Sequence, residues 1–94
     1  MYMVHVVATC AAHQSLKEPE VLMRALQRAD EARGWLEHAR IHPSRGGAKV
    51  VLFLIGPDSR AARQYGRELF RRAVSNEPAL DTWALAECDL LPVA

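Results

Sequence analysis

Apolar residues follow two alternating patterns along the chain, short continuous runs and stripes at helical spacing. The β-branched run Tyr2–Cys10 predicts a first strand. A helix is predicted between a start within Ser15–Pro19 and a stop at Gly34. At the start, either Ser15 and Glu18 form a capping box, or Glu18 is the cap and Pro19 is the first helical residue. Its apolar residues recur three and four positions apart: Val21, Leu22, Ala25, Leu26 and Ala29.

The segment Trp35–His42 fits two kinds of element. Its apolar spacing would also extend the preceding helical stripe, which would give a β-α-β-α-β chain. We favour a strand, because Gly34 interrupts the helix and Pro43–Gly47 has the composition of a hairpin loop. The apolar run Lys49–Ile55 is then the second arm of the hairpin.

The second half of the chain predicts one more helix and one more strand. Gly56–Ser59 turns the chain and caps a helix over about Ser59–Ser75. An unbroken apolar stripe follows that helix, and Gly66 on the stripe predicts a close approach of helix to sheet. Thr82–Leu91 predicts the last strand. The order β-α-β-β-α-β is that of an α+β, ferredoxin-like domain over residues 1–94, with an antiparallel sheet and two helices on one face.

Strand alternation divides the side chains between a face under the helices and an open face. Under the helices we expect Val4, Val6, Ala8, Cys10, Trp35, Ala39, Ile41, Ala84, Ala86, Cys88 and Leu90. On the open face we expect Met3, His5, Val7, Thr9, Leu36, His38, Arg40, His42, Trp83, Leu85, Glu87 and Asp89. The third strand is apolar on both faces, and such a strand needs cover on both. A second copy of the chain, sheet against sheet, would provide it.

Composition narrows the class of protein. The 94 residues are 50% hydrophobic and 24% charged, with twelve Lys+Arg against eleven Asp+Glu, which excludes a disordered chain and fits one domain. The longest apolar run, Val50–Ile55, is too short to span a membrane. Two cysteines form no disulfide framework, and we expect a protein of the reducing cytoplasm.

The layout resembles a known group of small proteins. The Val-His-Val-Val-Ala start at Val4–Ala8, the element order and the length are similar to the dimeric α+β barrel proteins, among them muconolactone isomerases and antibiotic-biosynthesis monooxygenases. The stretch Gly34–His38 is similar to the segment that opens the second strand of the isomerases. The helix at about Ser59–Ser75 is longer than in those isomerases. The resemblance implies an architecture and a cavity, and it assigns no catalytic residue.

Two groups of polar residues are candidates for catalysis on the open face. If His5 lies opposite Glu87, the carboxylate would fix the imidazole tautomer and raise its basicity, as a general base requires. His38, Arg40 and His42 would line one face of the second strand, where they could bind an anionic or enolic oxygen. The alternatives are a strand histidine with an ordinary hydrogen bond and the usual polar residues of an edge strand.

Other patterns point to ordinary structural roles. His38 and His42 would have metal-ligand spacing only in a helix, and a third ligand is missing, so we expect no metal. The second helix carries five arginines, which are Arg60, Arg63, Arg67, Arg71 and Arg72. Because the net charge is only +1, we interpret them as a solvated helix face and not as a nucleic-acid surface. No phosphate-binding loop appears, and we expect no cofactor.

These observations lead to two functional hypotheses. In the first, a homodimer binds a small apolar or aromatic molecule, polyketide-like by the resemblance, and isomerises, cyclises or oxygenates it without a cofactor. His5 or His38 would be the base, oriented by Glu87, and Arg40 would stabilise an oxyanion. Phe53, Trp83 and Leu85 would form apolar walls and His42 would contact the ligand. In the second, the open face is a non-catalytic protein-protein or dimer interface.

Overall fold

The computed structural model describes residues 1–10, 19–80 and 82–91. Four strands form one antiparallel sheet in the order β2-β3-β1-β4. Their bounds are Tyr2–Thr9 for β1, Leu36–Ser44 for β2, Gly47–Leu54 for β3 and Ala84–Leu90 for β4. The helices are α1 (Pro19–Asp30), α2 (Ser59–Asn76) and the short 3₁₀ helix η1 (Pro78–Leu80). The predicted α+β, ferredoxin-like arrangement is therefore confirmed, including a strand in place of a helix for the segment Trp35–His42. The strand β2 also takes in Pro43 and Ser44, which the sequence assigns to the hairpin loop.

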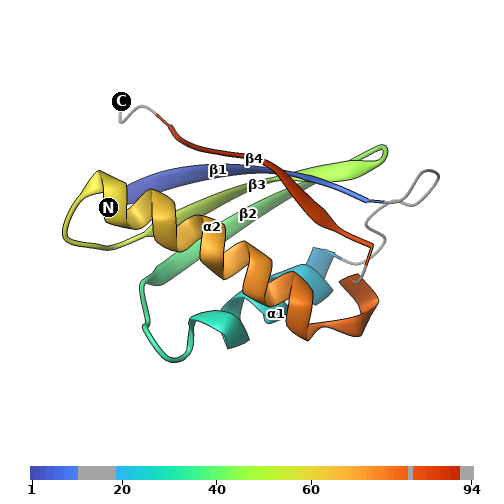
Figure 1. Ribbon diagram of the computed structural model, residues 1–94, viewed down its shortest axis with the longest axis horizontal. Helices are drawn as coiled ribbons and strands as arrows, with labels where there is room; N and C mark the ends of the chain where they lie inside the picture. Colours follow the sequence, from blue (N-terminus) through green and yellow to red (C-terminus); the bar gives the residue numbers. More distant parts are fainter. Residues whose placement is uncertain (11–18, 81, 92–94) are drawn as a thin grey trace.

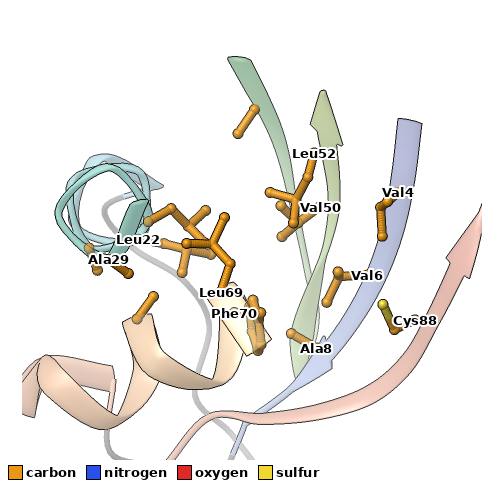
Figure 2. Packing of buried hydrophobic residues seen from close by; sticks show 14 of the residues in the cluster. Val4, Val6, Ala8, Leu22, Ala29, Val50, Leu52, Leu69, Phe70 and Cys88 are labelled. Carbon is orange, nitrogen blue, oxygen red and sulfur yellow. The ribbon is translucent and has the colours of Figure 1, made fainter. Parts of the chain in front are cut away.

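Both helices pack on the same face of the sheet (Figure 1). In the core, β1 and β3 point their alternate side chains toward the helices (Figure 2). These residues are Val4, Val6 and Ala8 on β1, Val50, Leu52 and Leu54 on β3, and Leu22, Leu26, Leu69 and Phe70 on the helices. Each large apolar side chain that is fully buried stabilises the fold by about 1.5–3 kcal/mol. The strand faces predicted for β1 and β3 are confirmed.

Gly66 allows α2 to lie close to the sheet, as its position on the apolar stripe predicts. A Cβ at this position would lie 2.9 Å from Cγ1 of Val4 and 3.4 Å from Cδ1 of Leu54. Real side-chain contacts are not that short, so any larger residue would push the helix away from β1 and β3.

Local signals in the sequence explain where the helices begin and end. Asp58 caps α2, since its carboxylate accepts a 2.7 Å hydrogen bond from the N–H of Ala61. Pro19 occupies the first position of α1, while Ser15 and Glu18 lie outside the described residues. After α1, Gly34 has a φ of 71° and donates a 2.7 Å hydrogen bond to the carbonyl of Asp30. A positive φ suits glycine, which therefore ends the helix.

Two β-bulges interrupt the strict alternation of side chains between the two faces of the sheet. One lies between Leu36 and His38 on β2, and the other lies between Leu85 and Glu87 on β4. An extra residue in a strand shifts the following side chains to the opposite face. The short helix η1 is not predicted by the sequence pattern, and β4 begins at Ala84, two residues after the predicted start at Thr82. Within the described residues, neither α1 nor α2 combines the length and apolar character needed to cross a membrane.

Candidate functional site

The sheet face away from the helices, here the open face, carries most of the predicted site. Cross-strand pairing arranges its side chains in three rows across the sheet. The rows are His38–Phe53–Met3, then Arg40–Val51–His5–Asp89, then His42–Lys49–Val7–Glu87. Six of the eight predicted site residues are on this face, namely His5, His38, Arg40, His42, Phe53 and Glu87. Among the described residues, no helix lies over it.

The open face has an apolar centre and oppositely charged sides. On β1 and β3, Met3, Val7, Val51 and Phe53 are partly buried in the single chain. Basic residues and histidines lie toward β2, and the acids Glu87 and Asp89 lie on β4. On β3, Val51 and Phe53 make the open face apolar as predicted, whereas Lys49 interrupts it near the hairpin, and the charge changes sign across the four strands.

Phe53 lies between two polar side chains of β2. The ring centroids of His38 and Phe53 are 5.7 Å apart, with the planes tilted by 39°. The guanidinium carbon of Arg40 lies 5.8 Å from the Phe53 centroid, within the range of a cation–π contact. An imidazole, a guanidinium and an apolar ring are thus brought together on one edge of the face.

The predicted pairing of His5 with Glu87 is wrong. His5 lies opposite Asp89, and Glu87 lies opposite Val7, one pair further along β4. The carboxylate of Asp89 also reaches Arg63 on α2, with an oxygen 3.8 Å from Nη2. Glu87 therefore cannot orient His5 as expected, and the acid opposite His5 is one that Arg63 already contacts.

The expected walls Trp83 and Leu85 do not lie on the open face. Trp83 precedes β4 and is buried in the core, with 8% of its surface exposed. Leu85 pairs with Ala8 and packs against the core, because the bulge between Leu85 and Glu87 inverts the alternation. The other bulge does the same to Leu36, which pairs with the buried Leu54. Conversely, Ala84 and Ala86 are exposed instead of lying under the helices.

Some of the α2 arginines hold other elements in place. Arg63 donates from Nε to the carbonyl of Cys88 at 3.2 Å, and Arg72 donates to the carbonyl of Ala29 at 3.3 Å. Cys88 is itself buried, and that burial raises the pKa of its thiol. Two of the five arginines thus link α2 to β4 and to α1 instead of only facing solvent.

Sequence reasoning missed a polar cluster at the end of α1. The carboxylate of Asp30, only 7% exposed, accepts hydrogen bonds from the N–H of Trp35 at 3.0 Å and of Leu36 at 3.1 Å. It also accepts one from the hydroxyl of Tyr65 at 2.5 Å. Burial, and next the bond to Asp30, raise the pKa of Tyr65. The available signal was that Asp30 continues the buried stripe of Leu22 and Leu26 at a spacing of four residues.

A shallow pocket of about 200 Å³ lies beside this cluster. It is lined by Arg33, Trp35, Ala61, Gln64, Tyr65 and Glu68. The rings of Trp35 and Tyr65 meet edge to face with centroids 5.1 Å apart. The guanidinium of Arg33 lies over both, 4.7 Å from the Trp35 centroid and 5.5 Å from that of Tyr65. Aromatic, cationic and anionic groups therefore share one cavity.

The described residues contain no group of three or more His, Cys, Asp or Glu side chains that could hold a metal ion. His38 and His42 are on one strand four residues apart, about 13 Å at 3.3 Å per residue, too far for one ion.

No model of a known protein family matches the chain, and no curated protein matches it either.

Proposed function

We propose that the chain functions as a homodimer whose two open faces pack together. The single observation that carries the proposal is the group of partly buried apolar side chains on the two central strands of that face. Met3 lies opposite Phe53, and Val51 neighbours Phe53 on the same face of β3 and lies diagonal to Val7. Scattered apolar residues on a surface need no explanation, whereas a contiguous patch with a polar rim is typical of an interface.

The charge pattern of the open face favours a second copy as the partner. A twofold axis parallel to the strands, midway between β3 and β1, places β2 of one protomer over β4 of the other. Each cross-strand row then meets its own copy. Arg40 faces the partner's Asp89, and His42 faces the partner's Glu87. An axis perpendicular to the strands would oppose like charges, so the charge pattern supports the first orientation.

The area of the face suits such a pair. With strands about 4.8 Å apart and about 3.3 Å per residue, four strands of eight residues cover roughly 500 Å² per protomer. Two protomers together then bury about 1,000 Å², the lower limit of specific interfaces. We therefore expect a dimer that dissociates in the micromolar range.

Sedimentation equilibrium tests the dimer. Phe53→Glu places a charge in the apolar centre and is expected to weaken dimerisation at least tenfold, with the fold checked by circular dichroism. Gln27→Glu is the matched control, because it adds the same charge on an exposed position of α1. A wild-type chain that stays monomeric at millimolar concentration contradicts the proposal.

A charge exchange tests the orientation. Arg40→Glu with Lys49→Glu makes both sides of the face acidic, and Glu87→Lys with Asp89→Lys makes both sides basic. Each double variant is expected to be monomeric, because its own copies repel. An equimolar mixture of the two is expected to form heterodimers in native mass spectrometry. If each variant dimerises as well as the wild type, the proposed axis is wrong.

The second candidate function is binding of a small aromatic or apolar molecule at the same face, with or without chemistry. The observation that favours it is the grouping of His38 and Arg40 around Phe53. That edge offers a ring to stack on and donors for an anionic oxygen. Titration of the ¹⁵N-labelled protein with benzoate is expected to shift resonances of β2 and β3. Loss of those shifts in His38→Ala, a position that faces no acid in the proposed dimer, with dimerisation intact, separates this function from the first.

A further inference from the structure

The pocket between the α1–β2 turn and α2 lies on the helix side of the sheet, apart from the open face. Its volume of about 200 Å³ is below the 300–1,000 Å³ typical of sites for drug-sized molecules. A liquid water occupies about 30 Å³, so the space suits a ligand of roughly seven to ten non-hydrogen atoms.

Arg33 presents an ordered cation to this pocket. Its guanidinium carbon lies 4.7 Å from the ring centroid of Trp35 and 5.5 Å from that of Tyr65, so both rings hold the cation at the pocket by cation–π contacts. Among the described residues, no carboxylate lies within 4.0 Å of it. A guanidinium held on two rings and without an acidic partner among those residues can bind a carboxylate with two hydrogen bonds, and the ring contacts lower the side-chain entropy that binding would cost.

The aromatic wall behind Arg33 is anchored by Asp30. Its carboxylate accepts from the hydroxyl of Tyr65, which holds that ring, and from the backbone N–H of Trp35, which holds the main chain there. The Trp35 ring also packs on Gly56, where a Cβ would lie 3.4 Å from Cζ3. The pocket therefore has a fixed apolar surface against which a ligand side chain can pack without reorganisation.

Glu68 limits which anions the pocket can accept. It lines the same cavity from α2 and, within the described part of the chain, forms no ion pair. Its negative charge disfavours phosphate or a dicarboxylate, and it supplies an acceptor for a positively charged group. The side-chain amide of Gln64, one helical turn away, can donate to or accept from the ligand.

We infer that this pocket binds a small zwitterion, an α-amino acid with an apolar side chain. Its carboxylate binds the guanidinium of Arg33, its ammonium group binds Glu68, and its side chain packs on the ring of Trp35. Opposite charges that share a pocket without contacting each other fit a ligand that carries the complementary pair. A plain carboxylate would satisfy Arg33 and leave Glu68 repelling it.

Three related probes test the inference: L-leucine, N-acetyl-L-leucine, which lacks the ammonium group, and L-leucinamide, which lacks the carboxylate. The ¹⁵N-labelled wild-type chain is titrated with each, and the indole N–H resonance of Trp35 is followed. Leucine is expected to bind in the millimolar range and to shift that resonance. Each of the other two is expected to bind at least tenfold more weakly. Equal shifts with all three, or none with leucine at 50 mM, overturn the inference.

Two variants assign the charged contacts. Arg33→Ala is expected to weaken leucine binding at least tenfold, and Arg45→Ala, which removes an exposed arginine from the β2–β3 turn, is expected to leave it unchanged. Glu68→Gln is expected to weaken binding of leucine while leaving that of N-acetyl-L-leucine the same or stronger. If Glu68→Gln weakens both probes equally, the ammonium contact is excluded and the proposal fails.

Discussion

Removing the carboxylate of Asp30 is expected to destabilise the fold more than any exposed charge change. Asp30→Ala leaves the N–H groups of Trp35 and Leu36 and the hydroxyl of Tyr65 without their acceptor. A hydrogen bond to a charged group contributes about 1.5–3 kcal/mol. Since the three bonds share one acceptor and part of the cluster reaches solvent, we expect a total loss of about 3–5 kcal/mol.

That loss is a large fraction of the total free energy of unfolding. A chain of this length has a free energy of unfolding of roughly 5–14 kcal/mol. A small domain loses about 4–8 °C in Tm per kcal/mol, so the variant is expected to melt at least about 12 °C below the wild type. Urea unfolding followed by circular dichroism gives the free energy directly. The control is Glu31→Ala, which removes an exposed carboxylate one residue further along and should cost less than about 0.5 kcal/mol.

A double-mutant cycle locates the effect. Tyr65→Phe alone removes one donor and is expected to cost about 1.5–3 kcal/mol, since Asp30 keeps both backbone donors. In the Asp30→Ala background, the same change should cost at least about 1 kcal/mol less. The reasoning is refuted if Asp30→Ala costs under 1 kcal/mol, or if the two changes are additive.

Two further predictions concern the helix–sheet contact and alkaline pH. Gly66→Ala is expected to cost about 1–2 kcal/mol, because overpacking against Val4 outweighs the gain in helix propensity; adding Val4→Ala should recover part of the loss, and no recovery would contradict the close approach. Tyr65 has a raised pKa in the folded state, so it contributes stability below its unfolded pKa of about 10 that is lost as pH rises further. Between pH 9.5 and 11.5, the free energy of unfolding should therefore fall more steeply in the wild type than in Tyr65→Phe, and equal slopes would exclude this role.

The order of elements could be predicted because several boundaries have a local chemical cause. Gly34 ends the first helix, Gly46 takes a φ of 75° in the hairpin turn, and Asp58 caps α2. The choice of a strand for 36–44 followed from those neighbours rather than from its own apolar spacing. Interruptions by glycine and proline therefore carried more information than periodicity in that segment.

Side-chain placement on the edge strands could be predicted only in part. One extra residue, Glu37 on β2 and Ala86 on β4, changes the face of every residue before it. Leu36 and Leu85 were misplaced for this reason. Neither bulge contains a glycine or a proline that would reveal it in the sequence. Its position depends on the pairing register with the neighbouring strand, which the sequence of one strand does not show. The central strands have no bulge in their mutual pairing, and their faces followed directly from alternation.

The two edge strands of the sheet, β2 and β4, are poorly suited to pair with a strand of another molecule. Glu37 interrupts the outer strand β2 with a bulge, and Pro43 has no N–H to offer. On β4, Ala86 forms the second bulge, and the side chain of Arg63 already occupies the carbonyl of Cys88. A strand from another molecule would have to displace these groups, so edge-to-edge pairing of sheets into fibres is opposed. In the proposed dimer the contact is made by the face instead, and a face-to-face pair related by a twofold axis closes on itself and does not grow.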